Sequence, residues 1–296
     1  MKITKGIKEK KLLILIYGRD GIGKSSLAGQ FPTPLFIGPE DGTSFLDVAR
    51  VEGISDWKTF IKTVDDVVLK IDTLNFETIV IDSLDWVEPL IHDFICKKYK
   101  VDNLAQAAKG YGAGYKESFD MQVELKNKLK IINQKKNVIL IAHSQVKSFN
   151  DPVTESSYDR YELKLHESNS VSPRALWREF VDAILFINHD VVTSGEGKDA
   201  RASTFGTFLF TKGTPAFDAK RRVLMPDKIK FETTGMYDLI KSYFSSADKN
   251  LYAQVLSLAE DCKDEAIRKK ALSELPKHRE NNLKLKEIQQ FLEGKK

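Results

Sequence analysis

The sequence predicts an α/β fold in which helices flank a mostly parallel sheet. Two observations indicate this class. Short apolar runs of strand length alternate with longer segments of helical periodicity. The short runs are apolar at consecutive positions, as in strands covered on both faces. From about Met236 the strand signal stops, and polar, charged segments of helical character follow. We therefore expect a helical C-terminal tail after the α/β core.

The first part of the core begins with the apolar run KLLILIY at 11–17, which predicts a buried strand. A glycine-rich turn separates it from a helix expected at 25–30. The short run PLFI at 34–37 predicts a second strand, and TFIKTVDDVVLKI at 59–71 has the apolar spacing of an amphipathic helix. ETIVIDSLD at 77–85 then predicts a strand that ends in acidic residues.

The rest of the core repeats this alternation. Helices are expected at 86–99 and again up to about residue 134. Apolar runs predict the remaining strands, which are 137–142, 181–192, 204–212 and 228–232. The tail has no strand signal and is interrupted by Pro276. These patterns predict a core domain at 1–236 and a helical extension at 237–296.

The composition excludes several classes of protein. The chain has 296 residues, and its 46 basic and 42 acidic residues give a formal charge of +4, which is too mild to indicate nucleic-acid binding by itself. Cys96 and Cys262 lie far apart and the five histidines are not clustered, so no structural zinc site is expected. No apolar run reaches the length of a membrane span, and no secretory segment follows Met1. We expect a cytoplasmic protein that does not associate with membranes.

The segment between the first strand and the first helix matches the phosphate-loop motif G-x-x-x-x-G-K-[ST] in full. Glycines let successive backbone N–H groups approach a phosphate, and the following helix adds the positive end of its dipole. In such a loop Lys24 contacts the terminal phosphates of ATP, and the Ser25 hydroxyl binds Mg²⁺. The alternative is a glycine turn with a chance lysine, which the flanking strand and helix disfavour. The expected nucleotide-binding residues are Gly18, Arg19, Asp20, Gly21, Ile22, Gly23, Lys24, Ser25 and Ser26.

An acidic residue at the end of a later apolar strand completes such a site. TIVID ends in Asp82, which can hold Mg²⁺ together with Ser25. The alternative is that Asp82 caps the following helix, as Ser83 or Asp85 could also do. Many P-loop ATPases have a water-activating glutamate directly after this aspartate, whereas this chain has Ser83. Either the general base lies elsewhere, with Glu40 as the candidate, or the protein hydrolyses ATP slowly.

These motifs resemble those of RecA-type ATPase cores, in particular the compact phage-encoded group related to the Sak recombinases. The resemblance rests on GRDGIGKSS, the glutamate of LFIGPEDG, TIVIDS, VILIAHSQV and the late segment AFDAKRRVLMPDKIKFE. It covers about residues 10–235 and not the tail. It implies a RecA-like P-loop NTPase core that binds and hydrolyses ATP with Mg²⁺. It also implies action on single-stranded DNA in phage recombination or single-strand annealing.

The resemblance implies roles for two polar residues outside the phosphate loop. Glu40 corresponds to the general base that polarises the attacking water. Gly38 departs from an acidic residue often seen in the family, and Asp41 is the second candidate base. The alternative for Glu40 is an exposed loop glutamate without a catalytic role. His143, at the end of a strand, corresponds to the residue that senses the terminal phosphate, and Gln145 is the second candidate.

RecA-type cores bind single strands with loops that follow the strands of the metal aspartate and of the sensor residue. The first matching stretch, 97–118, has tyrosines between lysines around the glycines of GYGAGY. Lysines neutralise DNA phosphates while tyrosine rings stack on bases. The alternative is a solvated helix face whose tyrosines fold into the core. The second stretch, 146–175, is expected to be a long polar loop. The candidate DNA-binding residues are Lys109, Tyr111, Tyr115 and Lys116.

Related cores work as filaments or rings in which the nucleotide lies between subunits. The resemblance therefore implies self-association, in which a basic residue of AKRR reaches the neighbour's terminal phosphate. The candidates are Lys220, Arg221 and Arg222. The alternative is a basic turn that leads into the strand at 228–232.

The leading hypothesis is an ATPase that binds single-stranded DNA, hydrolyses ATP faster on DNA and works with a phage annealing or single-strand-binding protein. A second hypothesis is a stand-alone ATPase that loads or remodels a replication protein. A small-molecule kinase is the third, disfavoured by Glu40 and by the absence of an arginine-rich lid. Stimulation by DNA separates the first two hypotheses, and a phosphorylated product would identify the third.

Overall fold

The computed structural model describes residues 3, 10–151, 156–168, 170–194, 201–244, 251–252, 255–256, 258–260, 262–278 and 281–294. The strands are β1 (Leu13–Gly18), β2 (Pro34–Ile37), β3 (Ala49–Arg50), β4 (Thr78–Ile81), β5 (Asn137–Asp151), β6 (Ser156–Leu163), β7 (Ala183–Ser194), β8 (Arg201–Phe210), β9 (Lys220–Arg221) and β10 (Lys228–Lys230). The α-helices are α1 (Lys24–Gly29), α2 (Trp57–Leu69), α3 (Leu84–Tyr99), α4 (Ala113–Ile132), α5 (Pro173–Phe180), α6 (Met236–Phe244), α8 (Glu265–Glu274) and α9 (Asn282–Glu293). Two 3₁₀ helices are η1 (Leu104–Lys109) and η3 (Leu275–His278).

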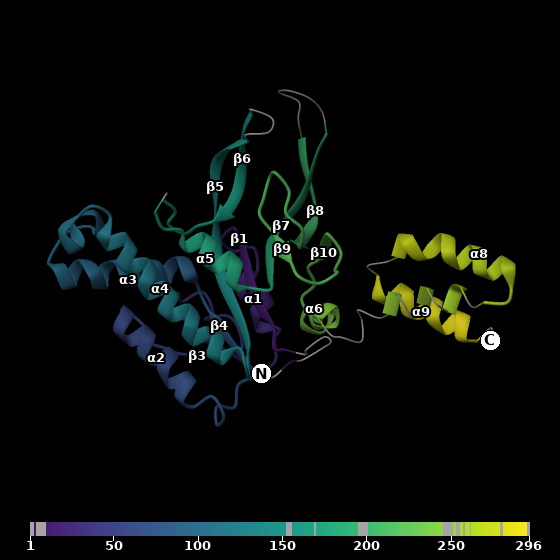
Figure 1. The fold of residues 1–296 in the computed structure, drawn as a ribbon, viewed down its shortest axis with the longest axis horizontal. Helices are drawn as coiled ribbons and strands as arrows, with labels where there is room; N and C mark the ends of the chain where they lie inside the picture. Colours follow the sequence, from purple (N-terminus) through teal and green to yellow (C-terminus); the bar gives the residue numbers. More distant parts are fainter. Residues whose placement is uncertain are drawn as a thin grey trace. The chain divides into compact units, whose positions relative to one another are not determined.

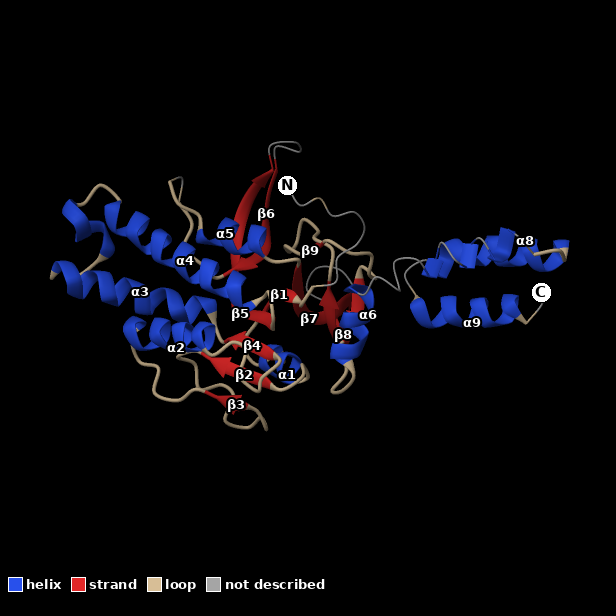
Figure 2. Cartoon of the chain, turned by 60° about the horizontal axis from the view of Figure 1, so that its bottom comes forward, coloured by secondary structure: helices blue, strands red, loops and turns tan. Residues whose placement is uncertain are grey.

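The strands form a mixed sheet whose central part is parallel (Figure 2). The strand order is β10-β8-β7-β1-β5-β4-β2-β3. The six strands from β7 to β3 in this order run parallel to one another, while β8 pairs antiparallel with β7. The predicted α/β class with a mostly parallel sheet is therefore confirmed.

Helices cover the sheet, and α2, α3, α4 and α5 lie together on one side of it (Figure 1). The core on this side joins strand residues such as Leu15 and Leu140 to Phe60, Ile91 and Leu129 of the helices. The helix α1 packs against β1 and β5. Successive residues of β1 and β4 are all buried, which explains why the sequence shows continuous apolar runs rather than alternation.

The carboxyl ends of the parallel strands meet at one edge of the sheet, where ligands bind in folds of this kind. In the strand register Gly18 lies opposite His143, and Ile37 lies opposite Ile81. Because β5 lies between β1 and β4, His143 enters this edge between the phosphate loop and Asp82.

The strand β5 does not stop at residue 142, as the sequence predicts, but continues to Asp151 and pairs antiparallel with β6. We call this hairpin, residues 144–151 and 156–163, the arm (Figure 1). The prediction of one long polar loop over 146–175 is therefore wrong for the described residues, because β6 and α5 occupy much of it. Residues 152–155 and 169 of that stretch lie outside the described residues.

The chain divides into two compact units. The larger unit consists of Lys11–Arg221 and Lys228–Met236, and the smaller one contains the described residues of Met1–Lys10, Arg222–Asp227 and Tyr237–Lys296. Buried apolar residues of the C-terminal helices, among them Leu275 and Leu285, form a separate core. A helical C-terminal region is therefore present, as predicted, while its division from 1–236 as a domain stays a prediction.

Among the helices of the described residues, none is long and apolar enough to cross a membrane.

Candidate functional site

The phosphate loop connects β1 to α1 and is shaped by its glycines. Gly21 and Gly23 have φ angles of 68° and 106°, a region that side chains with a Cβ rarely adopt. Gly23 is the N-cap of α1. The loop therefore exposes successive backbone N–H groups at one point, which is the arrangement that binds an anion.

Lys24 is buried, with 5% of its surface exposed. Its Nζ donates hydrogen bonds to the backbone oxygens of Gly18 at 3.3 Å and Arg19 at 2.9 Å. Burial lowers the pKa of this ammonium, and the carboxylates of Glu40 and Asp20 oppose that shift. The ammonium is therefore held beside the loop by weak carbonyl acceptors, which phosphate oxygens can replace.

Ser25 and Asp82 provide two oxygens at the same place, because the Ser25 hydroxyl donates to Asp82 Oδ2 at 2.8 Å. Asp82 is 3% exposed, and burial raises its pKa to about 6. A hard divalent cation prefers hydroxyl and carboxylate oxygens, and its charge would compensate this buried carboxylate. The donor set therefore fits Mg²⁺.

Glu40 lies in the loop that follows β2, and its Oε2 accepts a hydrogen bond from the Ser83 hydroxyl at 3.0 Å. Its Oε1 is 3.7 Å from His143 Nε2. Ser83, which stands where many P-loop ATPases have a glutamate, thus orients a glutamate from the loop after β2. Asp41, the second candidate base, is exposed and accepts a hydrogen bond from the Ser44 hydroxyl at 2.7 Å instead.

Gly38 explains how the Glu40 loop reaches the site. A Cβ at this position would lie 1.7 Å from the backbone oxygen of Asp82, so no side chain fits there. The glycine that departs from the acidic residue of RecA-type cores is therefore required by the close approach of the two loops.

Asp85 holds His143 in place through hydrogen bonds, a contact that was not predicted from the sequence. Asp85 accepts hydrogen bonds from the His143 backbone N–H at 2.9 Å and contacts Nδ1 of the ring at 2.8 Å. This hydrogen bond raises the pKa of His143. Because Nδ1 is engaged, Nε2 is directed into the site, where it lies 3.2 Å from Asp20 Oδ1.

Residues of the phosphate loop, Glu40 and His143 line one cavity of about 590 Å³. Its lining combines the phosphate loop, Glu40 and His143 with residues that sequence reasoning missed, namely Gly42, Phe45, Leu46, Trp86 and Lys164. The cavity volume is in the range of small-molecule sites. The predicted loop, base and sensor are thus brought together in a space that accepts a ligand.

A family model described as "AAA domain" matches residues 10–223. The chain belongs to the AAA domain family. Members are P-loop ATPases, so nucleotide binding at the phosphate loop follows from the family as well as from the motif. The match does not extend to the narrower resemblance to Sak-type recombinases.

One curated relative of this AAA domain comes from a phage-derived region. The SPbeta prophage-derived uncharacterized protein YorG of Bacillus subtilis (strain 168) is 24% identical over 144 residues. The aligned residues make up 48% of this chain and 43% of YorG, so the chain covers less than half of that protein's length.

Two predicted site residues of the AAA domain are not among the residues that line its cavity. Lys220 is paired with Ile184 near the amino end of β7, whereas the phosphate loop lies at the carboxyl end of the sheet. Its Nζ donates to the backbone oxygens of Arg178 at 2.6 Å and Val181 at 2.9 Å. Arg222 belongs to the smaller unit. Their action on a neighbouring subunit stays a prediction.

Gln145, the second candidate for the sensor, and Arg221, the further basic candidate, also make contacts outside the cavity. Gln145 lies in the arm, and its side-chain amide donates to the backbone oxygen of Leu163 at 3.1 Å. Arg221 donates to the Thr211 hydroxyl at 3.0 Å. His143 is therefore the sensor candidate that lines the cavity.

The stretch 97–118 is not one continuous loop. Tyr115 and Lys116 lie in α4, because the turn of Gly110–Gly112 is completed before Ala113. The prediction that these two residues lie in a loop is therefore wrong, while contact of Lys116 with DNA stays a prediction. The Tyr115 ring is stacked on His166 with centroids 4.6 Å apart, so this ring face cannot stack on a base. Lys109 and Tyr111 do lie at an exposed corner, both with positive φ.

Proposed function

We propose that this AAA domain is a Mg²⁺-dependent ATPase of the RecA-like kind, whose turnover is coupled to single-stranded DNA in phage recombination or strand annealing. The observation that supports hydrolysis most directly is the position of Glu40. Its carboxylate accepts a hydrogen bond from Ser83 and lines the cavity that contains Lys24. A kinase would need to exclude water at this place, whereas a positioned carboxylate activates it.

Each group in the cavity has its own task. Glu40 accepts the proton of the attacking water. Lys24 and the backbone N–H groups of the loop bind the phosphates and stabilise the charge that develops during phosphoryl transfer. Ser25 and Asp82 would hold Mg²⁺, which neutralises part of the phosphate charge when bound.

His143 connects this chemistry to the arm. Its Nε2 faces the cavity, while its backbone continues without a break into the outgoing strand of the arm. A change at the terminal phosphate that moves the ring therefore acts on the root of the arm, and a partner bound to the arm acts on the ring. This connection supports coupling between ATP turnover and a bound strand.

The arm carries an aromatic pair that is suited to stacking on the bases of a single strand. Phe149 and Tyr158 lie opposite each other with ring centroids 5.5 Å apart, and the Arg160 guanidinium lies over the Phe149 ring at 5.4 Å. Aromatic rings beside a cation stack on bases without reading their sequence.

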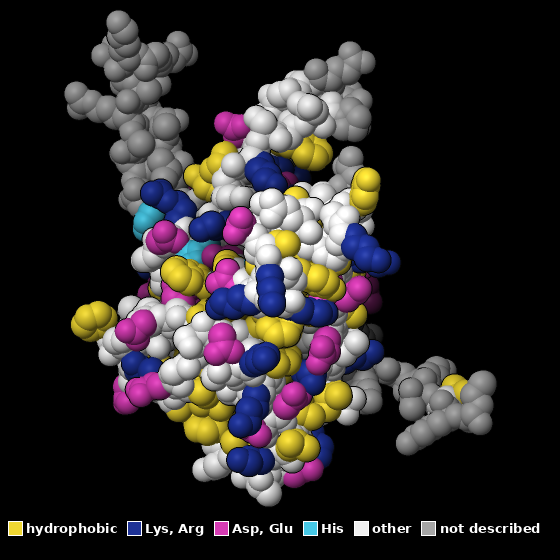
Figure 3. Space-filling view, turned by 90° about the vertical axis from the view of Figure 1, so that its left-hand side faces the viewer, with side chains coloured by type: hydrophobic (Ala, Val, Ile, Leu, Met, Phe, Trp, Pro, Cys, Tyr) yellow, Lys and Arg dark blue, Asp and Glu magenta, His cyan; other side chains and the backbone are white. Residues whose placement is uncertain are grey.

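The far end of α3 provides a second candidate DNA contact. A helix of 16 residues is about 24 Å long, so this end lies well away from Asp85 at the start of α3. Lysines and acidic side chains are interspersed on the face that Figure 3 shows. DNA binding at this face would depend on contacts of individual lysines with phosphates, because the described residues of the face form no continuous positively charged patch.

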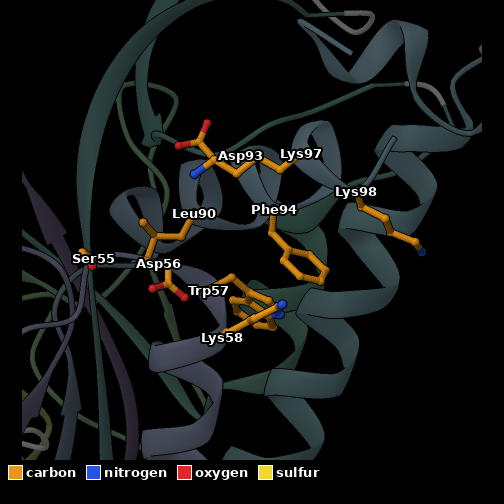
Figure 4. Close-up of a pocket in the computed structure, with 9 residues that line it drawn as sticks. All are labelled: Ser55, Asp56, Trp57, Lys58, Leu90, Asp93, Phe94, Lys97 and Lys98. Atoms are coloured by element: carbon orange, nitrogen blue, oxygen red, sulfur yellow. The ribbon is translucent and has the colours of Figure 1, made fainter. Parts of the chain in front are cut away.

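A cavity of about 570 Å³ lies on this helix beside Lys97 and Lys98. Figure 4 shows the Phe94 ring beside Trp57 and Lys58 within it, and the Lys58 ammonium is 5.7 Å from the Phe94 centroid. Trp57 is buried, and the carboxylates of Asp56 and Asp93 also line this cavity. The half-buried Phe94 ring, with the lysines at the rim, is the part that suits a base and its flanking phosphates.

The wider context of the proposal comes from YorG and from the resemblance to RecA-type cores. The prophage origin of YorG supports a phage protein. Self-association into a filament or ring, with Lys220 or Arg222 at the neighbour's phosphate, belongs to the proposal, as does a phage annealing or single-strand-binding protein as partner. Lys220 would have to leave its two carbonyl acceptors to take that role.

A second candidate function is loading or remodelling of a replication protein. The shape of the arm supports this function equally well, because the edge strand of an antiparallel hairpin can pair with a strand of another protein. The two functions differ in whether single-stranded DNA binds.

Replacing Lys109 and Lys116 by alanine is expected to weaken binding of single-stranded DNA uniformly across sequences. Each lost phosphate contact should reduce the salt slope of binding by about 0.7. Tyr111→Ala should cost about 1–3 kcal/mol through lost stacking, with little change of the slope. The measurement is the affinity for several oligonucleotides over a series of salt concentrations.

Lys130→Ala is the matched control, because Lys130 is exposed near the opposite end of α4 from Lys116. It should leave the salt slope unchanged. An equal loss for Lys130→Ala would show that these contacts are non-specific. A wild-type protein that binds no single-stranded DNA with or without ATP would contradict the recombinase function and leave the protein-loading function.

A further inference from the structure

The residue that follows the arm lies in the same cavity as the residue that precedes it. β5 leaves the cavity after His143, and β6 ends at Leu163, directly before the cavity residue Lys164, with Ser144 opposite Leu163. The next residue, Lys164, donates its backbone N–H to the His143 backbone oxygen at 2.9 Å. Both ends of the arm are thus joined at the wall of the nucleotide cavity.

The return of the arm is fixed by α3 in the same way as its departure. Asp85 holds the backbone N–H of His143, and Glu88, three residues later, accepts the backbone N–H of His166 at 3.0 Å. Residues three apart lie on one face of a helix. Glu88 is itself buried and accepts a hydrogen bond from Gln122 at 3.1 Å. The backbone around Lys164 is therefore held firmly in place.

The side chain of Lys164 is exposed and lines the cavity together with Lys24 and Glu40. Within the described part of the chain, no carboxylate lies within ion-pair distance of its ammonium, and no side-chain hydrogen bond engages it. Lysine supplies a compact point charge on a flexible stem, which suits a phosphate oxygen. The basic candidates predicted to act from a neighbour, by contrast, do not line this cavity.

We propose that Lys164 is a second phosphate-binding lysine, which contacts the terminal phosphate of ATP within the same chain. This inference rests on the proposed function, because it assumes that the cavity binds ATP. It means that the two residues that flank the arm, His143 before it and Lys164 after it, both contribute a side chain to the terminal phosphate. A ligand on the arm would therefore change two phosphate contacts at once.

The test is equilibrium binding of Mg²⁺ complexes of ADP and of the non-hydrolysable β,γ-imido analogue of ATP, measured by titration calorimetry. Lys164→Ala should weaken binding of the analogue about tenfold, the usual effect of a lost hydrogen bond to a charged group. ADP, which lacks the terminal phosphate, should bind within about twofold of wild type. Lys164→Arg keeps the charge and should restore most of the analogue affinity.

Lys147→Ala is the matched control, because Lys147 is an exposed lysine of the adjoining arm that does not line the cavity. It should change neither affinity. An unchanged ratio of analogue to ADP affinity in Lys164→Ala, or an equal loss in Lys147→Ala, would overturn the inference while leaving the proposed function intact. A wild-type protein that binds neither nucleotide would overturn both.

Discussion

Glu40→Gln is expected to lower the rate of ATP hydrolysis by about 10²–10⁴-fold, which is the usual loss when a general base is removed. The amide keeps the shape of the side chain and can still accept the hydrogen bond from Ser83. It cannot take the proton of water. ATP affinity should therefore change little, and any complex with DNA should last longer. The measurements are the steady-state rate of phosphate release and the ATP affinity of the same variant.

Asp41→Asn is the control for this variant, because the Asp41 carboxylate is exposed and bonded to Ser44. It is expected to hydrolyse ATP at nearly the wild-type rate. If Asp41→Asn is inactive and Glu40→Gln is active, the general base is Asp41. The hydrogen bond from Ser83 to Glu40 would then have no role in catalysis.

Lys24→Ala is expected to lower the rate of hydrolysis by at least about 10²-fold, the effect of removing one preorganised charge at the reacting group. It should also remove much of the preference for ATP over ADP, because the lost ammonium contacts the terminal phosphates. Lys62→Ala, which removes an exposed lysine of α2, should have no effect. A Lys24→Ala protein that hydrolyses ATP at the normal rate would show that the phosphate loop is not the active site.

The sequence alone was sufficient to predict the part of the site that is formed by one continuous segment, the phosphate loop. The phosphate loop needs glycines at fixed spacing between a strand and a helix, so GRDGIGKSS indicates it without tertiary information. The strand of Asp82 is apolar at consecutive positions because both of its faces are covered. Such features depend on neighbours in sequence.

The contacts between distant segments were not predictable in this way. Asp85 and His143 meet because β5 lies between β1 and β4, and no periodicity encodes that strand order. The fit of Gly38 against the Asp82 backbone is likewise a property of the assembled edge. From the sequence, Asp85 was a candidate to cap the helix that follows Asp82. In the structure its carboxylate hydrogen-bonds to His143.

The arm escaped prediction for a different reason. The outgoing strand beyond His143 has the polar sequence SQVKSFND and pairs with β6, so several of its residues face solvent and no continuous apolar run marks it. Tyr115 was misassigned because a glycine-rich sequence favours a loop, while the glycine at 114 fits closely against the Leu104 backbone oxygen. In both cases packing overrode the local signal.

The measurement that tests the coupling of ATP turnover to DNA most directly is the rate of ATP hydrolysis by the wild-type protein with and without single-stranded DNA, at low and at moderate salt. We expect DNA to raise the rate at low salt, and the increase to shrink at moderate salt as counterions compete for the phosphate contacts. A rate that is the same with and without DNA at both salt concentrations would contradict the coupling.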